Sequence, residues 1–287
     1  DTGEPKLEEF FRYKKEFVIV NGHSNVGKTT TMLYLIANSA VRHDWKWVVY
    51  SSENRTASVK MSLMQFAMDK KVADMTFGER KQAYKWVQEQ FTVNNNNQVY
   101  SYSDIVLFME KVMRQQPVDG IFIDPYNSLK LDMKGSGIGV HDYHYEAASE
   151  FLTFSKANEI AVWLNCHSGT EAQRRKGPDG LPVAPYAEDT EGGGKFVNRA
   201  DCFLTIHRKV QAMDHNIRKM SEIHVRKVRE VETGGQPTPL EDPYCLVMNL
   251  SHTGFNTRIG QRALFKPITF KEETQLPFNS AFLSTEG

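Results

Sequence analysis

The feature that most constrains the fold is a short segment near the N-terminus that holds two glycines, a lysine and a threonine at fixed spacing. The segment GHSNVGKT matches the pattern GxxxxGK[ST], and its residues are Gly22, His23, Ser24, Asn25, Val26, Gly27, Lys28 and Thr29. The apolar run FVIV before it indicates a buried strand, and TTTMLYLIANSA after it has the pattern of a helix. A strand, a glycine-containing turn and a helix in this order are typical of a phosphate-binding loop, or P-loop.

The P-loop predicts the chemistry of its ligand. Glycine lets the backbone curl so that several N–H groups face one anion, and the N-terminus of the following helix adds partial positive charge. Lys28 can reach the β and γ phosphates of a nucleoside triphosphate, and the Thr29 hydroxyl can bind Mg²⁺. Thr30 follows in the first turn of the predicted helix and is counted with the nucleotide-binding residues. We therefore expect ATP and Mg²⁺ as ligands; the alternative is a glycine turn that matches by chance.

Apolar runs and helical patterns alternate along the rest of the chain. Further strands are predicted at 45–52, 120–124 and 160–166, and helices at 59–72, 77–91, 104–116 and 144–159. Such alternation is typical of an α/β fold, in which helices cover both faces of a mainly parallel, twisted sheet. The later predicted strands lie at 201–208, 222–228 and 244–251. Because they come without long helices, we expect antiparallel pairing toward the C-terminal end.

Two acidic residues follow predicted strands. The run IFID ends in Asp124, and a carboxylate at the carboxyl edge of a buried strand lies where ligands bind in such sheets, so Asp124 is predicted to hold Mg²⁺. Pro125 comes next, so a catalytic carboxylate must come from elsewhere in the chain. Glu53 ends the run VVYSSE and is predicted to polarise the attacking water. The alternative for Glu53 is a place in a helix N-cap region.

Three other residues are candidates for catalysis. His167 follows the strand IAVWLNC and could contact the γ-phosphate; the alternative is a structural or surface histidine. Lys227 and Arg229 lie at the end of the predicted strand 222–228. Cations there could stabilise the charge of phosphoryl transfer, often from a neighbouring subunit. The alternative is an ordinary solvated strand end.

Two polar loops follow the predicted catalytic strands, at 127–141 and 168–189. Loops with glycines and a few cations suit contact with a nucleic-acid backbone without regard to sequence. The candidate contacts in them are Lys130, Lys134, Arg174, Arg175 and Lys176. The alternative for the run RRKG is a solvated surface turn. Aromatic residues are almost absent from both loops, so base stacking is not expected.

Composition limits the remaining possibilities. The chain has 287 residues, 40% of them hydrophobic, which suits one large domain over 1–261 with a wrapping or flexible tail over 262–287. Lys plus Arg equals Asp plus Glu, and this zero balance argues against a protein that coats DNA. Three widely spaced cysteines indicate reduced core thiols and no zinc site. No membrane span and no signal peptide are expected, and the first residue, Asp1, suggests a piece of a longer protein.

Taken in order, these motifs resemble the RecA-like domains of superfamily 4 helicases, which include DnaB-type replicative helicases, phage primase-helicases and Twinkle. The resemblance covers 7–254, with GHSNVGKT, SSEN, IFIDPYN, LNCHSG, EGGGKFVNRADCFLTIHR and RKVREVETGG in the family's order. It implies that Glu53 is the general base and His167 the γ-phosphate sensor. It also implies that Lys227 and Arg229 reach the nucleotide of a neighbouring subunit. The long 168–190 loop and the spacer after Arg229 depart from the family's commonest form.

The same resemblance implies the partners. The two polar loops would line a central channel around single-stranded DNA, with RNA as the alternative. We expect a homo-hexamer for the whole protein, a monomer or weak assembly for the chain alone, and primase or other replication proteins as further partners. The location would be intracellular and cytoplasmic, with a bacterial virus or its host as the source. Two other functions stay open: a RecA or RadA-type recombinase ATPase, and a non-motor ATP switch such as a helicase loader.

Overall fold

The computed structural model describes residues 1–94, 98–132 and 139–270, and in them one sheet of nine strands runs through the molecule. The strand order is β3-β2-β4-β5-β1-β6-β7-β8-β9. The strands are β1 Phe17–Asn21, β2 Trp47–Ser51, β3 Phe91–Val93, β4 Gly120–Asp124, β5 Ala161–Asn165, β6 Cys202–His207, β7 Met220–Val228, β8 Tyr244–Met248 and β9 Phe255–Asn256. The six strands from β3 to β6 pair in parallel, and β7, β8 and β9 add antiparallel pairs. The predicted α/β fold with an antiparallel end is therefore confirmed.

The parallel strands are buried on both faces because their side chains alternate between two apolar cores. In β1, Val18 and Val20 join one core, whereas Phe17 and Ile19 join the other. The same alternation runs through β2, β4 and β5, for example with Trp163 in the first core. Successive side chains of a strand point to opposite faces, so a run such as FVIV must be apolar throughout to lie in the middle of such a sheet.

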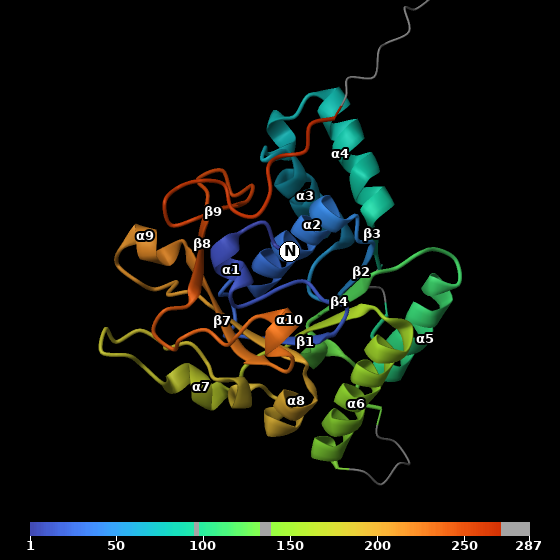
Figure 1. Cartoon of the computed structure of the whole chain (residues 1–287), viewed down its shortest axis with the longest axis vertical. Helices are drawn as coiled ribbons and strands as arrows, with labels where there is room; N and C mark the ends of the chain where they lie inside the picture. The colour runs from blue at the N-terminus through green and yellow to red at the C-terminus, as the bar shows by residue number, and fades with distance from the viewer. Residues whose placement is uncertain (95–97, 133–138, 271–287) are drawn as a thin grey trace, which may run out of the picture.

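Helices form the two outer layers. The longer helices are α2 Lys28–His43, α3 Thr56–Met68, α4 Phe77–Gln90, α5 Tyr102–Met113, α6 Val140–Asn158 and α8 Gly193–Arg199. The shorter ones are α1 Pro5–Glu8, η1 Val72–Asp74, η2 Tyr126–Ser128, α7 Thr170–Arg174, η3 Ala187–Asp189, α9 His215–Arg218 and α10 Val231–Gly234. Helices α2, α3 and α4 pack on one face of the sheet, and α5, α6 and α8 cover the other (Figure 1). Capping boxes at Thr76 and Ser101 fix the starts of α4 and α5.

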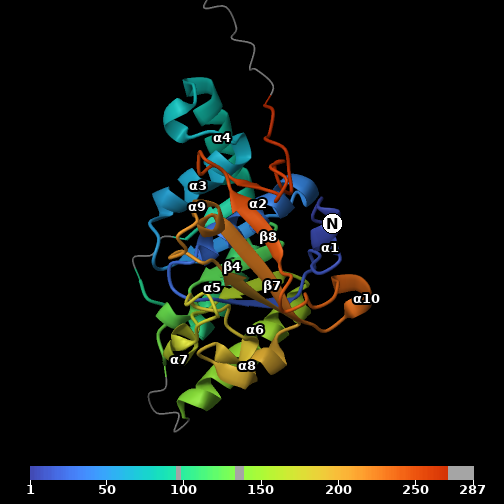
Figure 2. The same cartoon turned by 90° about the vertical axis from the view of Figure 1, so that its left-hand side faces the viewer.

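The antiparallel end differs from the parallel core in what covers it. Figure 2 shows α9 and α10 at opposite ends of β7, with β8 beside it. Strands β3 and β9 were not expected from the sequence. Residues 262–270 continue from β9, and Phe265 packs its ring on Tyr34 of α2 while Arg262 pairs with Asp69. Residues 271–287 lie outside the described residues.

The cysteines, the helices and the metal-ligating side chains give three further findings. Cys166, Cys202 and Cys245 are all buried and none forms a disulfide. Across the described ranges, none of the helices is both long enough and apolar enough to cross a lipid bilayer. No cluster of three or more histidine, cysteine or carboxylate side chains suited to a metal ion occurs in the described part of the chain.

The buried histidine of β6 gives a stability prediction. His207 is 2% exposed, and burial lowers its pKa to about 4. In the unfolded chain this histidine is protonated below about pH 6.5, whereas in the folded chain it stays neutral until about pH 4. The free energy of unfolding therefore falls as the pH is lowered from about 6.5 toward 4. This histidine is expected to contribute about 3 kcal/mol to that loss. Chemical denaturation across this pH range should show a shallower loss in His207→Leu, and identical pH slopes would contradict the prediction.

Candidate nucleotide-binding site

The P-loop lies at the carboxyl end of β1, between the ends of β5 and β6. A Cβ atom at Gly22 would lie 2.3 Å from the carbonyl oxygen of Ile206, so only glycine allows the loop to pass this close to β6. Gly27 has a φ of 86° and stands immediately before α2, and Asn25 also has a positive φ, of 62°. The loop therefore turns sharply into the helix. The N–H groups of the first turn of α2 have no partner within the helix and suit an anion.

Lys28 is turned back onto the loop. Its Nζ donates hydrogen bonds to the carbonyl oxygens of Gly22, at 3.0 Å, and His23, at 2.8 Å. The side chain is buried, and burial lowers the pKa of Lys28 to about 8, although the negative charges of Asp124 and Glu53 oppose the shift. An ammonium group that binds carbonyl oxygens can exchange them for phosphate oxygens, which carry more charge.

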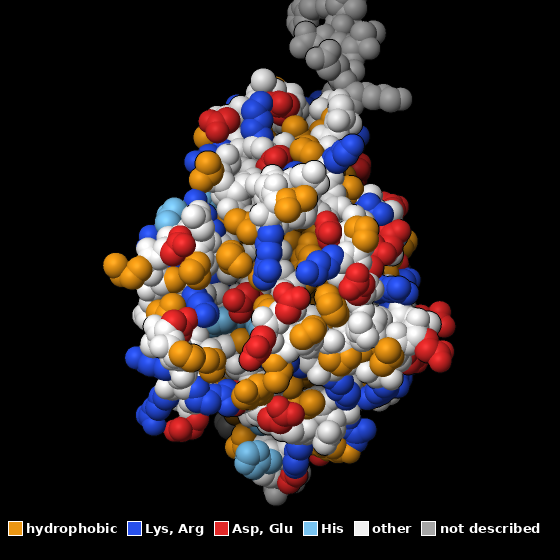
Figure 3. All heavy atoms as spheres, turned by 60° about the vertical axis from the view of Figure 1, so that its left-hand side comes forward, with side chains coloured by type: hydrophobic (Ala, Val, Ile, Leu, Met, Phe, Trp, Pro, Cys, Tyr) orange, Lys and Arg blue, Asp and Glu red, His pale blue; other side chains and the backbone are white. Residues whose placement is uncertain are grey.

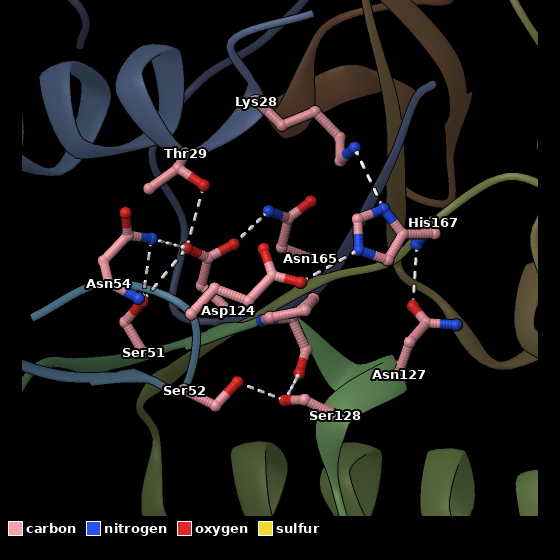
Figure 4. A network of polar contacts seen from close by, with 12 residues as sticks. Lys28, Thr29, Ser51, Ser52, Asn54, Asp124, Asn127, Ser128, Asn165 and His167 are labelled. Carbon is pink, nitrogen blue, oxygen red and sulfur yellow. Dashed lines mark hydrogen bonds and ion pairs between the residues drawn. The ribbon is translucent and has the colours of Figure 1, made fainter. Parts of the chain in front are cut away.

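Asp124 ends β4 beside the start of α2. One carboxylate oxygen accepts a hydrogen bond from the Thr29 hydroxyl at 2.8 Å, and the other accepts one from the amide of Asn165 at the end of β5. Ser51 and Asn54, at and after the end of β2, each lie 3.4 Å from the first oxygen (Figure 4). The carboxyl ends of three parallel strands thus meet at one carboxylate.

The charge of Asp124 is set by opposing effects. The side chain is 1% exposed, and burial raises the pKa of its carboxyl group. Hydrogen bonds from Asn165 and Thr29 lower this pKa, the negative charge of Glu53 raises it further, and the ammonium of Lys28 lowers it. A cation beside the carboxylate would favour the ionised form.

Glu53 follows β2 and His167 follows β5, and the ring of His167 lies between Lys28 and Glu53. Figure 4 shows the contact of Lys28 with His167. The Nζ of Lys28 lies 3.4 Å from Nδ1 of His167, and Nε2 of His167 lies 3.5 Å from a carboxylate oxygen of Glu53. If Nδ1 accepts from the ammonium group, Nε2 carries the proton and faces Glu53. The N–H of His167 also donates to the side-chain oxygen of Asn127 at 2.7 Å. Glu53 is not the N-cap of α3, since that position is Arg55.

These residues fit ATP and Mg²⁺. The buried carboxylate of Asp124 and the hydroxyl of Thr29 are oxygen ligands, which Mg²⁺ prefers, and they already lie within hydrogen-bond distance. Mg²⁺ is commonly held by one or two carboxylates together with substrate phosphates, so a small protein ligand set suits it. Lys28 would hold phosphate oxygens, and the loop residues Ser24, Asn25, Val26 and Thr30 would surround them. These roles stay predictions.

Lys227 and Arg229, here called the finger pair, lie far from this site. Nζ of Lys227 and the guanidinium of Arg229 donate to backbone carbonyls of residues 197–200 at the end of α8, and Arg229 also pairs with Asp201 at 2.7 Å. Asp201 accepts a hydrogen bond from the N–H of Phe17, the first residue of β1. The finger pair therefore lies at the amino end of β1, whereas the P-loop follows its carboxyl end, roughly 16 Å away for a strand of this length.

The candidate nucleic-acid contacts are placed differently from one another. Lys130 and Lys176 are exposed, and Arg174 is exposed beside Glu171, at the end of α7. Arg175 is instead held inward by an ion pair with Asp189 and lies over the ring of Tyr186. Lys134 lies outside the described residues. The 168–189 segment is thus more ordered than the loop expected from the sequence, since it contains α7, a hairpin and η3. Both signs of charge are interspersed on the face drawn in Figure 3.

Four side chains that were not predicted from the sequence also lie at the site. Asn165 and Asn54 contact Asp124, and Asn127 binds the backbone of His167. Arg208 lies at the end of β6, 3.5 Å from the carbonyl oxygen of Asn25 in the P-loop. Each of them ends a strand or follows one within a few residues. Their positions at strand ends could therefore have marked them as candidate site residues. Their partners depend on the order of strands in the sheet.

Comparison with known proteins gives one relative by sequence. No family model matches the chain. The Twinkle homolog protein, chloroplastic/mitochondrial, of Arabidopsis thaliana is 25% identical over 232 residues, which cover 76% of this chain and 31% of that protein. The chain therefore spans about a third of the length of this relative.

Solved structures are similar over most of the chain. One, described as an ATPase domain, has a TM-score of 0.70 at 15% identity and covers 90% of both chains. A DnaB-like replicative helicase, solved with regard to its interactions with primase, has a TM-score of 0.70 at 15% identity over 90% of this chain and 63% of its own. A KaiC-like protein from Pyrococcus horikoshii OT3 has a TM-score of 0.56 at 13% identity over 89% and 96%. The chain therefore has the RecA-like fold of the ATPase domains of DnaB-like replicative helicases, which confirms the resemblance predicted from its motifs.

Proposed function

We propose that this chain is the ATP-hydrolysing motor domain of a replicative nucleic-acid helicase that moves along single-stranded DNA. The observation that carries the proposal is the meeting of Lys28, Asp124 and Glu53, from three separate segments, around one P-loop. The similarity to the Twinkle homologue and the DnaB-like fold support the helicase class. Its ligands are ATP and Mg²⁺, and its partners are further copies of the same chain.

The roles of the residues follow from their positions. ATP with Mg²⁺ supplies the γ-phosphoryl group and neutralises part of its charge. Lys28 leaves the carbonyls of Gly22 and His23 and holds phosphate oxygens, while Thr29 and Asp124 hold the cation. Glu53, which is half-exposed, orients the attacking water and accepts its proton. His167 links Lys28 to Glu53, so loss of the γ-phosphate would alter the hydrogen bonds of both.

The proposed assembly follows from the place of the finger pair. Lys227 and Arg229 lie at the opposite end of β1 from the P-loop of their own chain, so they could serve only the nucleotide of another chain. A head-to-tail contact of this kind generates a ring when its rotation closes. The hollow lined by Lys14, Asp201 and Arg229 leaves the guanidinium reachable from outside. A hexameric ring around one strand, with primase among its partners, is the assembly that we infer for the whole protein.

The nearest alternative is a recombinase ATPase with the same core, and the next is an ATP switch without motor activity. ATPase activity measured with and without single-stranded DNA, on the chain and on the longer protein, tests the proposal directly. Fork unwinding without strand exchange would support a helicase, whereas strand exchange without unwinding would support a recombinase. Slow turnover that single-stranded DNA does not stimulate would favour the switch.

Nucleotide binding itself gives a prediction at Lys28. Lys28→Ala removes the ammonium group that binds the loop carbonyls of Gly22 and His23, so the thermal shift caused by ATP–Mg²⁺ should disappear. Ligand binding stabilises a protein by about 2.7 kcal/mol at 100 times its dissociation constant, so the lost shift is easily measured. Without ligand, the variant should have nearly the same melting temperature as the parent. Burial of the Lys28 ammonium is unfavourable in the folded chain, so its removal should cost little stability. A shift equal to that of the parent would contradict the assignment.

A further inference from the structure

The chain between α7 and η3 forms a tight hairpin, here called the 175–183 hairpin. The N–H of Val183 donates to the carbonyl of Arg175 at 3.1 Å, and the N–H of Gly177 donates to that of Leu181 at 2.8 Å. Lys176 and Pro182 pair as an isolated bridge. The tip is exposed, and its surroundings carry the predicted nucleic-acid contacts. A movement of this hairpin would therefore change the positions of Arg174, Arg175 and Lys176 relative to a bound nucleic acid.

The ring of His23 joins the P-loop to the base of this hairpin. Nε2 lies 3.0 Å from the carbonyl oxygen of Val183, and Nδ1 lies 2.9 Å from the hydroxyl of Ser168. A carbonyl oxygen can only accept, so Nε2 carries the proton and Nδ1 accepts from the hydroxyl when the ring is neutral. His23 is buried, so both bonds hold the ring in a single orientation. Ser168 itself follows His167 and donates its N–H to the carbonyl of Gly22 at 3.3 Å.

The backbone of the same residue holds Lys28. The carbonyl oxygen of His23 accepts from Nζ of Lys28 at 2.8 Å, so one residue contacts the phosphate-binding lysine and the hairpin at once. If Lys28 turned toward a triphosphate, this contact would be lost, and the His23 peptide would lose the hydrogen bond that its carbonyl accepts from Lys28. A shift of the His23 backbone would carry the ring with it and so alter the bond to Val183.

The residues beyond the hairpin are anchored independently. The side-chain amide of Asn21 donates to the carbonyl of Tyr186 at 2.8 Å, and Arg226 donates to the carbonyl of Pro185 at 2.9 Å. These bonds come from β1 and β7, in the middle of the sheet. A displacement that starts at Val183 is therefore directed into the hairpin and not into the segment that follows.

We propose that His23 is a positioning residue that transmits nucleotide binding at the P-loop to the 175–183 hairpin. The inference rests on the proposed function in that the P-loop must bind nucleotide. This connection is separate from the contact of His167 with Lys28 and Glu53. It runs through His23, which occupies the first variable position of the P-loop. Ser168 fixes the orientation of the ring, so it belongs to the same connection.

A probe on the hairpin tests this directly. Pro178→Cys places a thiol at the exposed tip, and the three native cysteines are buried, so an environment-sensitive fluorophore labels position 178 selectively. ATP–Mg²⁺ is added to each labelled variant until its own thermal-shift titration saturates. The labelled parent should change its fluorescence, and His23→Ala should reduce that change by about 5-fold or more, the lower range of measured couplings between sites. His23→Gln keeps a donor for Val183 and should restore most of the change.

The outcomes separate this inference from the proposed function. A full response in His23→Ala, or no response in a labelled parent that binds ATP, would overturn the role of His23 and leave the ATP site intact. Failure of the unmodified chain to bind ATP would defeat the proposed function and this inference with it. Should His23→Ala not bind ATP, Ser168→Ala decides the matter from outside the P-loop. It should weaken the response at saturating ATP, and an unchanged response would refute the connection.

Discussion

Replacing Glu53 with glutamine is expected to lower ATP turnover by about 10²–10⁴-fold, the range that a positioned general base contributes. Glutamine has nearly the same shape as glutamate but cannot accept the proton of the attacking water. ATP binding should persist, because Glu53 is half-exposed and its one hydrogen bond among the described residues is the 3.5 Å contact with His167. Steady-state phosphate release measured with single-stranded DNA, beside the ATP-induced thermal shift, separates turnover from binding.

A matched control is available on α5. Glu110 is a half-exposed carboxylate that forms an ion pair with Arg114, the residue that follows α5, so Glu110→Gln changes the same charge away from the site. It should keep the turnover of the parent. Turnover of Glu53→Gln within a few-fold of this control would remove Glu53 from the mechanism. Biological output that survives the loss of turnover would favour the ATP switch over the motor.

The central part of the fold could be predicted because local pattern and global position agree there. FVIV and IFID are apolar at each position before their polar ends, and strands buried on both faces require that. The P-loop pattern then fixes which strand end carries the ligand. Strand β3 was missed because Phe91–Val93 follows α4 without a break and continues its apolar pattern. Strand β9 contains only Phe255 and Asn256, and so short a strand has no pattern of its own.

The candidate site was predictable residue by residue but not contact by contact. Asp124, Glu53 and His167 each end or follow a strand, and parallel strands bring their carboxyl ends to one edge. The contact of Glu53 with His167 joins residues 114 positions apart, and it exists because β2, β4 and β5 are neighbours in the sheet. Sequence spacing carries no information on that order. The amide of Asn165 on Asp124 was missed for the same reason.

The lysine and arginine side chains show a different limit of prediction from sequence. A run such as RRKG shows where positive charge lies in the chain but not which acceptor lies next to it. Arg175 is paired with Asp189 and packed on Tyr186, whereas Arg174, one residue earlier, extends into solvent. Lys227 and Arg229 are likewise bound to carbonyl oxygens at the end of α8. Cations at the C-terminus of a helix complement its dipole, so these contacts have a structural role whatever else the residues do.

Replacing Arg229 with alanine is expected to lower DNA-stimulated ATP turnover of the assembled protein by about 10³-fold, the lower range for an arginine that stabilises transferred phosphate. The effect requires Arg229 to exchange Asp201 and the α8 carbonyls for the nucleotide of a neighbouring chain. The same substitution should leave ATP binding to an isolated chain unchanged, because the finger pair lies at the other end of β1. Arg229→Lys, which keeps the charge but not the planar fork, should recover only part of the turnover.

Mixing variants distinguishes action in trans from loss of stability. A chain with Lys28→Ala cannot use its own P-loop but still carries Arg229, and a chain with Arg229→Ala has the reverse defect. In a mixed assembly, some P-loops of the second variant meet an intact finger of the first, so turnover should exceed that of either variant alone. Arg229 also pairs with Asp201, so its loss could lower stability. The melting temperature of each variant is therefore measured together with its ATP turnover. A mixture no more active than its components, with both variants folded, would show that Arg229 does not act on a neighbour's nucleotide.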